Sequence, residues 1–557
     1  MSHNPVLHSF LKWEKETPDH IFLRQPVNGK WHEWTFRQSG NEIRKMASGL
    51  LSMNLPAHSN VAILSKNCAH WIMADLAIMM AGFVSVPLYA SISASSIRQI
   101  LEHSQSKAIF IGKLDEYEKQ KEGIPASILK ISIDFYGITE GELISQWNAT
   151  RQPLEKTYDW GAEELLTVMY TSGTTGRPKG VMFHSSAFRY VSKIMIDYLN
   201  RVNPLPAHPV LFSYLPLCHI AERDITEVLG CEIGASISFV ESLETFGRDL
   251  NSVQPHVFFG VPRIWARFQE KILEKLPQQK LSRLLKIPFI RSVLKQTLKK
   301  KLGLSRALLK ISGAAPMPLF LLNWFHQLGI DVREIYGMTE NCAISHGNQE
   351  EVKFGSVGKA MPTAEIKFTD QEEILTRHAA LMMGYYREPE MTREAFTPDG
   401  FLKTGDLGQT DADGFVFITG RVKDQFKTDK GKYVSPSPIE MRLLKNSDIE
   451  QVCVVGVSIP QPIALTILSE AGKQKSRSEI DESLLSSLNE VNQLIEDYER
   501  LKKAVILKND WTIENGLLTP TLKVKRNEVE KIHLPNYPNW YAQKEIVVWE
   551  EAGGGKP

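Results

Sequence analysis

The sequence predicts an α/β protein with at least two domains. Short apolar, β-branched runs, such as VAILS from Val61, KAIFIG from Lys107 and SISFVE from Ser236, alternate with helical stretches. This alternation is typical of α/β folds with largely parallel sheets. The 557 residues exceed what one compact core holds, and the 43% hydrophobic and 23% charged residues are ordinary for a folded globular chain.

The most hydrophobic segment, WIMADLAIMMAGFVSVPLYASI, starts at Trp71 and is long enough to cross a bilayer. It contains Asp75, Gly82 and Pro87, however, which a membrane-spanning helix disfavours. We therefore expect a buried helix, a glycine turn and then a strand that begins near Val84.

From about residue 364 the pattern changes to closely spaced strands and tight turns. Asp413-Gly414 separates two strand-like runs, which indicates a hairpin, and DADG at 411–414 lacks the further acidic positions of a calcium loop. After Arg421 follows a shorter α/β unit with strands QVCVVGVS, ALTILSE and KAVILK and one charged helix across SEIDESLLSSLNEVNQLIEDYERLKK. The predicted organisation is a large N-terminal domain of α/β subdomains plus a small β subdomain (1–421), a smaller mobile C-terminal α/β domain (422–550) and a disordered tail (551–557).

Charge and cysteine content exclude several classes of protein. The net charge of +1 gives no reason to expect nucleic-acid binding. The five cysteines are scattered without a Cys-x-x-Cys pair, which favours free thiols in a reducing compartment. The first twenty residues lack the apolar segment of a secretory signal, so we expect a cytoplasmic protein.

The run MYTSGTTGRPKG at 169–180 is rich in hydroxyls and glycines and includes a lysine. Its spacing does not fit a Walker A loop, but its glycines let backbone N–H groups approach an anion, and its hydroxyls and lysine suit phosphate. On composition alone a surface loop is an equal alternative. The candidate phosphate-binding residues are Thr171, Ser172, Gly173, Thr174, Thr175, Gly176 and Lys179.

The complete string YTSGTTGxPKG resembles the signature of the adenylate-forming (AMP-binding) superfamily of acyl-CoA synthetases, luciferases and peptide-synthetase adenylation domains. Further motifs of that family follow in order: SYLPLCHIAER (213–223), ISGAAPMP (311–318), IYGMTEN (335–341), GSVGKAMP (355–362), MGYYREPEMTREAF (383–396), FLKTGDLG (401–408), GRVKDQFKTDKGKYVSP (420–436) and LLTPTLKVKR (517–526). The resemblance spans almost the whole chain. It implies an enzyme that uses ATP and Mg²⁺ to activate a carboxylic acid as its adenylate.

The same resemblance implies roles for individual residues. Residues 171–179 wrap the β- and γ-phosphates, Thr339 binds the α-phosphate and Glu340 places Mg²⁺. The acceptor for the ribose hydroxyls is Asp406, and Arg421 is a further contact to ribose and phosphate. Around the adenine lie Gly313, Ala314, Ala315 and Tyr336, whose ring offers a flat face for stacking.

His219 resembles the family's histidine at the carboxylate end of the acyl site. A second pattern competes here, because His219 and Asp224 also match the His-x4-Asp pattern of glycerolipid acyltransferases. That pattern is short and lies inside the better-matching adenylation motif, so we favour the adenylation role. No Gly-x-Ser-x-Gly elbow of a hydrolase is present.

Lys523 is the candidate for the lysine that bridges the attacking carboxylate and the α-phosphate. The family's lysine usually follows a glycine, whereas Leu522 precedes it here, and Lys525 is a rival. In the resembling enzymes the C-terminal domain rotates about a residue that maps to Lys423. The rotation brings up the face with Lys427 and Gly431, along which the pantetheine of coenzyme A would reach the acyl-adenylate.

Two segments resemble the long-chain fatty acyl-CoA synthetase branch of the family, namely YERLKK (498–503) and ENGLLTPTLKVKR. We therefore expect a long-chain fatty acid–CoA ligase, with a fatty acyl-AMP ligase that loads a carrier protein, or a non-catalytic lipid-binding relative, as alternatives.

Between Lys275 and Lys310 there are eleven Lys or Arg and no Asp or Glu, interleaved with apolar residues. This pattern suits a peripheral contact with an anionic membrane, with a solvated basic face as the alternative.

Overall fold

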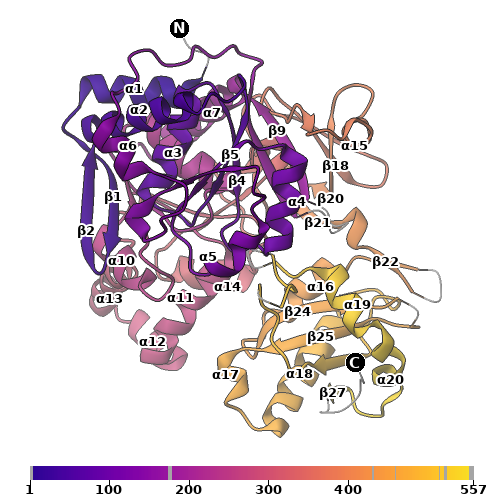
Figure 1. The fold of residues 1–557 in the computed structure, drawn as a ribbon. Helices are drawn as coiled ribbons and strands as arrows, with labels where there is room; N and C mark the ends of the chain where they lie inside the picture. The colour runs from indigo at the N-terminus through magenta and orange to yellow at the C-terminus, as the bar shows by residue number, and fades with distance from the viewer. Residues whose placement is uncertain are drawn as a thin grey trace.

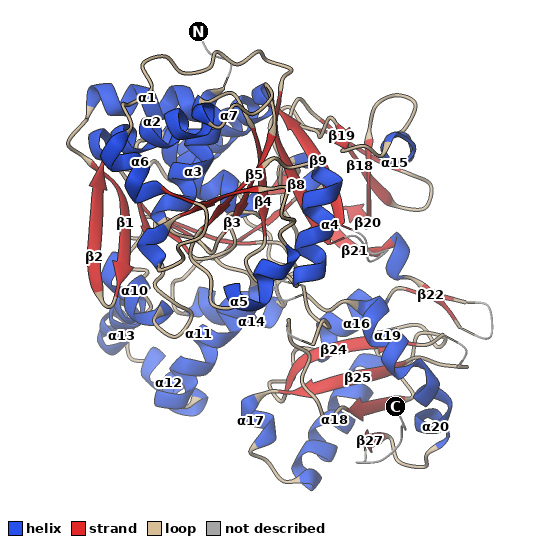
Figure 2. Cartoon of the chain, viewed as in Figure 1, coloured by secondary structure: helices blue, strands red, loops and turns tan. Residues whose placement is uncertain are grey.

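The computed structural model describes residues 4–172, 178–428, 432–457, 459–513, 515–519 and 523–550. The predicted fold class is confirmed: the chain up to β21 (Val416–Arg421) forms one large α/β body, and the chain from β22 (Phe426–Lys427) onward lies mainly in a second, smaller one (Figure 1). The central strands of the large body lie in its interior among helices, whereas β1 (Ile21–Val27) and β2 (Lys30–Thr35) lie at its left margin (Figure 2).

The first large sheet has eight strands in the order β19-β9-β8-β4-β3-β5-β6-β7. Its strands from β8 to β7 are parallel, whereas β9 and β19 join antiparallel at one edge. The strands are β3 (Asn60–Leu64), β4 (Val84–Leu88), β5 (Ala108–Ile111), β6 (Leu129–Ser132), β7 (Glu142–Leu143), β8 (Leu165–Ser172), β9 (Pro178–His184) and β19 (Gly384–Tyr385).

The hydrophobic segment from Trp71 folds as predicted. Every residue of α3 (Ala69–Met80) is buried, Gly82 turns the chain with φ +75°, and β4 begins at Val84. A Cβ on Gly82 would lie 2.6 Å from the ring of Tyr158, so the turn needs glycine for space as well as for its backbone conformation. Within the described residues, no helix is long and apolar enough to span a bilayer.

The second large sheet has nine strands in the order β16-β15-β14-β13-β12-β10-β11-β1-β2. Its strands are β1 (Ile21–Val27), β2 (Lys30–Thr35), β10 (Val210–Ser213), β11 (Ser236–Phe239), β12 (Val257–Phe259), β13 (Leu309–Ser312), β14 (Arg333–Tyr336), β15 (His346–Gly347) and β16 (Lys359–Ala360). Helices of the large body are α1 (Pro5–Glu16), α2 (Phe36–Ser52), α4 (Ala94–Ser104), α5 (Tyr117–Gln120), α6 (Ile144–Thr150), α7 (Ser185–Val202), α8 (Ile220–Glu222), α9 (Leu229–Glu232), α10 (Phe246–Val253), α11 (Pro262–Lys275), α12 (Gln278–Leu285), α13 (Pro288–Lys301), α14 (Leu319–Gln327) and α15 (Pro389–Ala395).

The expected small β subdomain is an antiparallel sheet in the order β17-β18-β20-β21. Its strands are β17 (Glu365–Phe368), β18 (Glu373–Arg377), β20 (Leu402–Thr410) and β21 (Val416–Arg421). Between β20 and β21, Asp411 accepts hydrogen bonds from the backbone N–H groups of Asp413 and Phe415, and Lys353 forms ion pairs with both aspartates. The DADG segment is therefore a turn, as expected.

The C-terminal body contains a sheet in the order β24-β25-β26-β27 and the hairpin β22-β23. Its elements are β22 (Phe426–Lys427), β23 (Tyr433–Val434), α16 (Pro436–Leu443), β24 (Ile449–Val455), β25 (Ile463–Leu468), α17 (Glu470–Lys473), α18 (Arg477–Asn492), β26 (Lys503–Ile506), α19 (Arg526–His533), α20 (Tyr537–Ala542) and β27 (Val547–Trp549). The charged helix is shorter than expected and ends at Asn492. The side chain of Asn492 exchanges two hydrogen bonds with the backbone of Leu501, at 2.8 and 2.9 Å, and this contact turns the chain back toward β26.

A buried ion cluster joins three elements of the large body. Arg223, the first residue of the π-helix Arg223–Val228, binds Asp75 of α3 at 2.5 Å, Glu227 at 3.0 Å and the hydroxyl of Thr167 on β8 at 2.8 Å. All four side chains are buried. One guanidinium thus contacts two buried carboxyl groups, while Glu227 Oε1 has no hydrogen-bond partner in the described chain.

Replacement of Arg223 by Leu should destabilise the large body by about 3–5 kcal/mol, because it leaves Asp75 and Glu227 buried without their cation. Calorimetry or circular dichroism should show a melting midpoint several degrees lower. The matched control is Arg393→Leu, which removes an exposed ion pair with Glu390 and should cost about 0–1 kcal/mol. Equal midpoints for the two variants would contradict the role given to the cluster.

Candidate functional site

The glycine and hydroxyl loop connects two paired strands. Thr171 on β8 lies opposite Lys179 on β9, so the loop is held at its base by an antiparallel ladder. The predicted residues Gly173, Thr174, Thr175 and Gly176 and the side chain of Ser172 lie outside the described part of the chain. Burial, together with the nearby charge of Lys423, lowers the pKa of Lys179.

Glu340 is held beside this hairpin by a residue that the sequence reasoning did not assign. Tyr385 on β19, which pairs with β9, donates its hydroxyl hydrogen to Glu340 Oε1 at 2.8 Å. The Lys179 Nζ lies 5.3 Å from the center of the Tyr385 ring. Tyr385 is part of the MGYYREPEM motif, but nothing in the sequence says which of its residues reaches Glu340.

The described residues contain no cluster of three or more His, Cys, Asp or Glu side chains suited to a metal. A lone carboxylate such as Glu340, next to the hairpin of β8 and β9, would fit Mg²⁺ all the same. This ion keeps several waters and is usually held by one or two carboxylates together with substrate phosphates.

The turn at residues 313–316, which we call the GAAP turn, follows the end of β13. Ala314 has a left-handed backbone with φ +67°, and a Cβ on Gly313 would lie 3.0 Å from Ile335 Cγ1. The buried Glu334 braces this turn, because its two oxygens accept from the backbone N–H groups of Met317 at 3.1 Å and Gly355 at 3.3 Å. Burial raises the pKa of Glu334 to about 7. In the sequence Glu334 was one glutamate in a short strand, so its role was missed.

Asp406 is the center of the predicted ribose end. It lies on β20 directly opposite Arg421 on β21, and Arg421 Nε donates to its Oδ1 at 2.5 Å. Tyr336, at the end of β14, donates its hydroxyl hydrogen to Oδ2 at 2.7 Å. Asp406 is buried, whereas the Arg421 side chain is about half exposed. The charge of Asp406 raises the pKa of Arg421.

Lys523 belongs to the C-terminal body and lies within electrostatic range of Arg421 and Asp406. Its backbone N–H donates to Thr519 Oγ1 at 3.0 Å in a turn closed by the Leu518–Val524 bridge. Lys523 has exposed surface. Desolvation by the surrounding protein, together with the charge of Arg421, lowers the pKa of Lys523 to about 8, and the charge of Asp406 opposes the shift. Lys525 instead lies at the start of α19, where its backbone N–H donates to Leu517 O at 2.8 Å.

His219 lies close enough to Lys523 to respond to its charge. Burial and Lys523 lower the pKa of His219 to about 4, so the imidazole is neutral at pH 7. Its Nδ1 accepts from the backbone N–H of Ala221 at 3.3 Å and caps α8. Asp224 is buried on the π-helix, and neither of its oxygens has a hydrogen-bond partner in the described chain. The two residues of the His-x4-Asp pattern therefore form no hydrogen-bonded dyad.

The structure describes only part of the face along which coenzyme A is predicted to enter, namely Lys427 but not Gly431. Lys427 on β22 is exposed, with its Nζ 5.5 Å from the ring center of Tyr433, while Gly431 lies outside the described residues. Lys423 is exposed in the short 3₁₀ turn Val422–Asp424 that follows β21. The ion pair between Arg263 of α11 and Glu450 of β24 links the two bodies.

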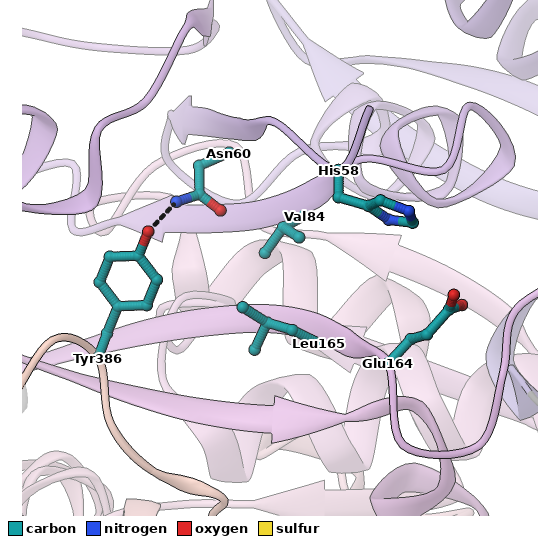
Figure 3. Close-up of a pocket in the computed structure, with 6 residues that line it drawn as sticks. All are labelled: His58, Asn60, Val84, Glu164, Leu165 and Tyr386. Atoms are coloured by element: carbon teal, nitrogen blue, oxygen red, sulfur yellow. Dashed lines mark hydrogen bonds between the residues drawn. The ribbon is translucent and has the colours of Figure 1, made fainter. Parts of the chain in front are cut away.

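Figure 3 shows a separate cavity of about 260 Å³ in the first sheet. It is lined by His58, Asn60, Val84, Glu164, Leu165 and Tyr386. Asn60, Val84 and Leu165 are the first residues of three parallel strands, so this cavity lies at the amino ends of these strands. The glycine loop follows the carboxyl end of β8. Ligands of open α/β sheets bind at the carboxyl ends of strands, and we do not assign this cavity to the site.

Two family models match the chain. The model of the AMP-binding enzyme matches residues 10–386, and that of the AMP-binding enzyme C-terminal domain matches residues 423–545. The chain belongs to the adenylate-forming superfamily of AMP-binding enzymes. This AMP-binding enzyme accordingly uses ATP to adenylate an acid, and its substrates are small molecules.

Curated relatives of this AMP-binding enzyme include long-chain-fatty-acid–CoA ligase FadD15 of Mycobacterium bovis, 29% identical over 95% of each chain. Another is the peroxisomal long chain acyl-CoA synthetase 7 of Arabidopsis thaliana, 26% identical over 92% of this chain and 82% of the relative. Among solved structures, the adenylation domain of a carboxylate reductase from Mycobacterium chelonae has a TM-score of 0.81 at 20% identity, over 98% of this chain and 91% of that chain. The o-succinylbenzoate CoA synthetase of Bacillus subtilis, in complex with its acyl-adenylate, has a TM-score of 0.72 at 21% identity, over 94% and 97%. At these identities the structures support the fold alone.

Because its pKa is lowered to about 8, Lys523 should react with an amine-modifying reagent near pH 8 faster than exposed lysines such as Lys445. Peptide mapping by mass spectrometry measures the rates. Arg421→Gln removes the charge that adds to desolvation in lowering this pKa, and it should slow the labelling of Lys523 without changing that of Lys445. Equal rates for both lysines, unchanged in Arg421→Gln, would contradict the arrangement.

Proposed function

We propose that this protein is an ATP-dependent long-chain fatty acid–CoA ligase. The main observation is that Lys523, from the C-terminal body, lies within electrostatic range of Asp406, Arg421 and His219 of the large body. Relatives named as long-chain fatty acid–CoA ligases along nearly the full chain support the choice of acid.

In the first half-reaction a carboxylate oxygen of the fatty acid attacks the α-phosphorus of ATP. The bond to the β-phosphate breaks, and acyl-AMP and pyrophosphate form. Lys179 and the loop with Thr171, Ser172, Gly173, Thr174, Thr175 and Gly176 hold the β- and γ-phosphates. Thr339 binds the α-phosphate, and Glu340 would hold Mg²⁺, which neutralises charge on the phosphates.

Lys523 bridges the incoming carboxylate and the α-phosphate, where negative charge gathers in the transition state. His219 lies at the carboxylate end of the acyl site and is neutral at pH 7, since its pKa is about 4. It therefore places a polar group beside the reacting carboxylate without adding a charge.

The nucleoside binds along the line from the GAAP turn to β20. Adenine lies against the backbone of Gly313, Ala314 and Ala315 and on the ring of Tyr336, and the ribose hydroxyls donate to Asp406. Each carboxylate oxygen accepts more than one hydrogen bond, so Asp406 can bind ribose while it keeps Tyr336 and Arg421 as partners.

In the second half-reaction the thiol of coenzyme A attacks the acyl carbonyl and AMP leaves, keeping one oxygen of the original carboxylate. We propose domains at 1–421 and 422–550 with a tail at 551–557, and a rotation of the second domain about Lys423. This rotation exchanges Lys523 for the face of Lys427 and Gly431, along which pantetheine enters.

We also propose that the reaction takes place in the cytoplasm at the inner face of a membrane, with residues 275–310 as the peripheral contact. All five cysteines are free and buried, as expected in a reducing compartment. A fatty acid that partitions into a bilayer would then be close to the enzyme.

Pyrophosphate release should depend on a long-chain fatty acid, and Lys523→Ala should lower it by about 100-fold or more because the transition-state charge loses its partner. The same variant should still convert supplied acyl-AMP and coenzyme A to acyl-CoA. Lys525→Ala is the matched control and should adenylate at close to the wild-type rate. If Lys525→Ala loses adenylation and Lys523→Ala does not, the lysine assignment is wrong.

The acceptor is tested in the same assay with coenzyme A against a holo-carrier protein. Acyl transfer to the carrier alone would identify a fatty acyl-AMP ligase. Absence of pyrophosphate release with every acid, in a protein that binds fatty acids, would identify a non-catalytic lipid-binding relative. An enzyme is favoured over a lipid-binding relative because the candidate catalytic and nucleotide-binding residues are all present, namely Lys179, Glu340, Asp406, Arg421 and Lys523.

A further inference from the structure

We propose that α12 and α13 form a docking surface that inserts apolar side chains into an anionic lipid membrane. Four apolar residues around the junction of the two helices are exposed, and we call them the α12–α13 tip. They are Ile287 (47% exposed), Phe289 (81%), Ile290 (37%) and Val293 (51%). Figure 1 shows these helices at the lower left margin of the large body.

The two helices also carry apolar residues that pack into the core of the large body, so they do not need the tip to hold them in place. Leu281 of α12 and Leu298 of α13 are buried in the core of this body, and Leu285 and Leu294 pack partly against the same core. The pair is therefore already anchored on one side. The apolar residues of the tip are a second apolar surface that folding leaves in contact with water.

The surroundings of the tip are basic. Residues 275–310 contain eleven Lys or Arg and no Asp or Glu. No basic side chain from Lys275 to Lys301 has an ion-pair partner in the described chain. The exposed ones are Lys275, Lys280, Arg283, Lys286, Arg291, Lys300 and Lys301.

An anionic lipid surface matches both properties. Its headgroups attract the unpaired lysines and arginines, and its acyl chains take up Phe289 and its apolar neighbours. A second copy of this chain would bring two basic surfaces together, which repel each other. A nucleic acid would pair with the charges but would leave the exposed aliphatic side chains in water.

This surface deepens the peripheral membrane contact proposed above, and its test is independent of the proposed reaction, because binding to vesicles needs neither ATP nor a fatty acid. The full-length protein is mixed with vesicles of phosphatidylcholine, with or without phosphatidylglycerol, and the bound fraction is measured by flotation. We expect binding only with phosphatidylglycerol, and a decrease as salt is raised.

Phe289→Ser removes the most exposed residue of the tip and should weaken binding by about tenfold or more. Leu494→Ser, which changes an exposed leucine in the C-terminal body, is the matched control and should bind like wild type. Lys286→Glu/Arg291→Glu should abolish binding, whereas Lys445→Glu/Lys502→Glu, which reverses two exposed lysines of the other body, should not. The melting midpoint of each variant confirms that it is folded.

The proposal is overturned if wild type binds phosphatidylglycerol vesicles no better than phosphatidylcholine vesicles, or if the tip variants bind like their controls. It is also overturned if Phe289→Ser converts a dimer to a monomer in light scattering while flotation stays unchanged. That result would make the tip an interface between copies of this chain.

Discussion

The arrangement of the site depends on the buried carboxylate of Asp406. It accepts a hydrogen bond from Tyr336 at the end of β14 and another from Arg421 at the end of β21. The bond from Tyr336 joins the second large sheet to the small β sheet, and the bond from Arg421 lies within the small sheet. Since the chain enters the C-terminal body directly after Arg421, the same carboxylate also fixes where the linker to that body begins.

Two pairs of cations in the site lie within electrostatic range of each other. Burial and the charge of Lys423 lower the pKa of Lys179, and burial and the charge of Arg421 lower the pKa of Lys523. Groups that repel in the free protein favour a polyanion between them. We propose that this repulsion favours the binding of a triphosphate, because the charges are in position before the reaction starts.

The sequence predicted those parts of the fold in which local pattern and burial agree. The run of apolar residues from Trp71 predicts a buried helix, a turn and a strand, because its apolar length, Gly82 and its β-branched residues all indicate these elements, and the structure confirms them. The sequence predicts a longer helix than α18, because the end of α18 depends on the contact between Asn492 and Leu501, which no local pattern reveals.

Within the site, motifs identified the residues whose type and spacing are distinctive, such as Lys179, Asp406 and Arg421. They did not reveal the partners that position them. Tyr385 and Glu334 reach Glu340 and the GAAP turn through contacts between segments distant in sequence. Ordinary residues with a tertiary role of this kind can be found only from the folded chain.

The most direct test of the account follows the oxygen atoms of the acid. A long-chain fatty acid labelled with ¹⁸O in its carboxylate is converted with ATP and coenzyme A, and the products are analysed by mass spectrometry. Attack of the carboxylate on the α-phosphorus predicts one ¹⁸O in AMP and none in pyrophosphate. Unlabelled AMP, with ¹⁸O in inorganic phosphate or only in the acyl product, would contradict activation of the acid through its adenylate.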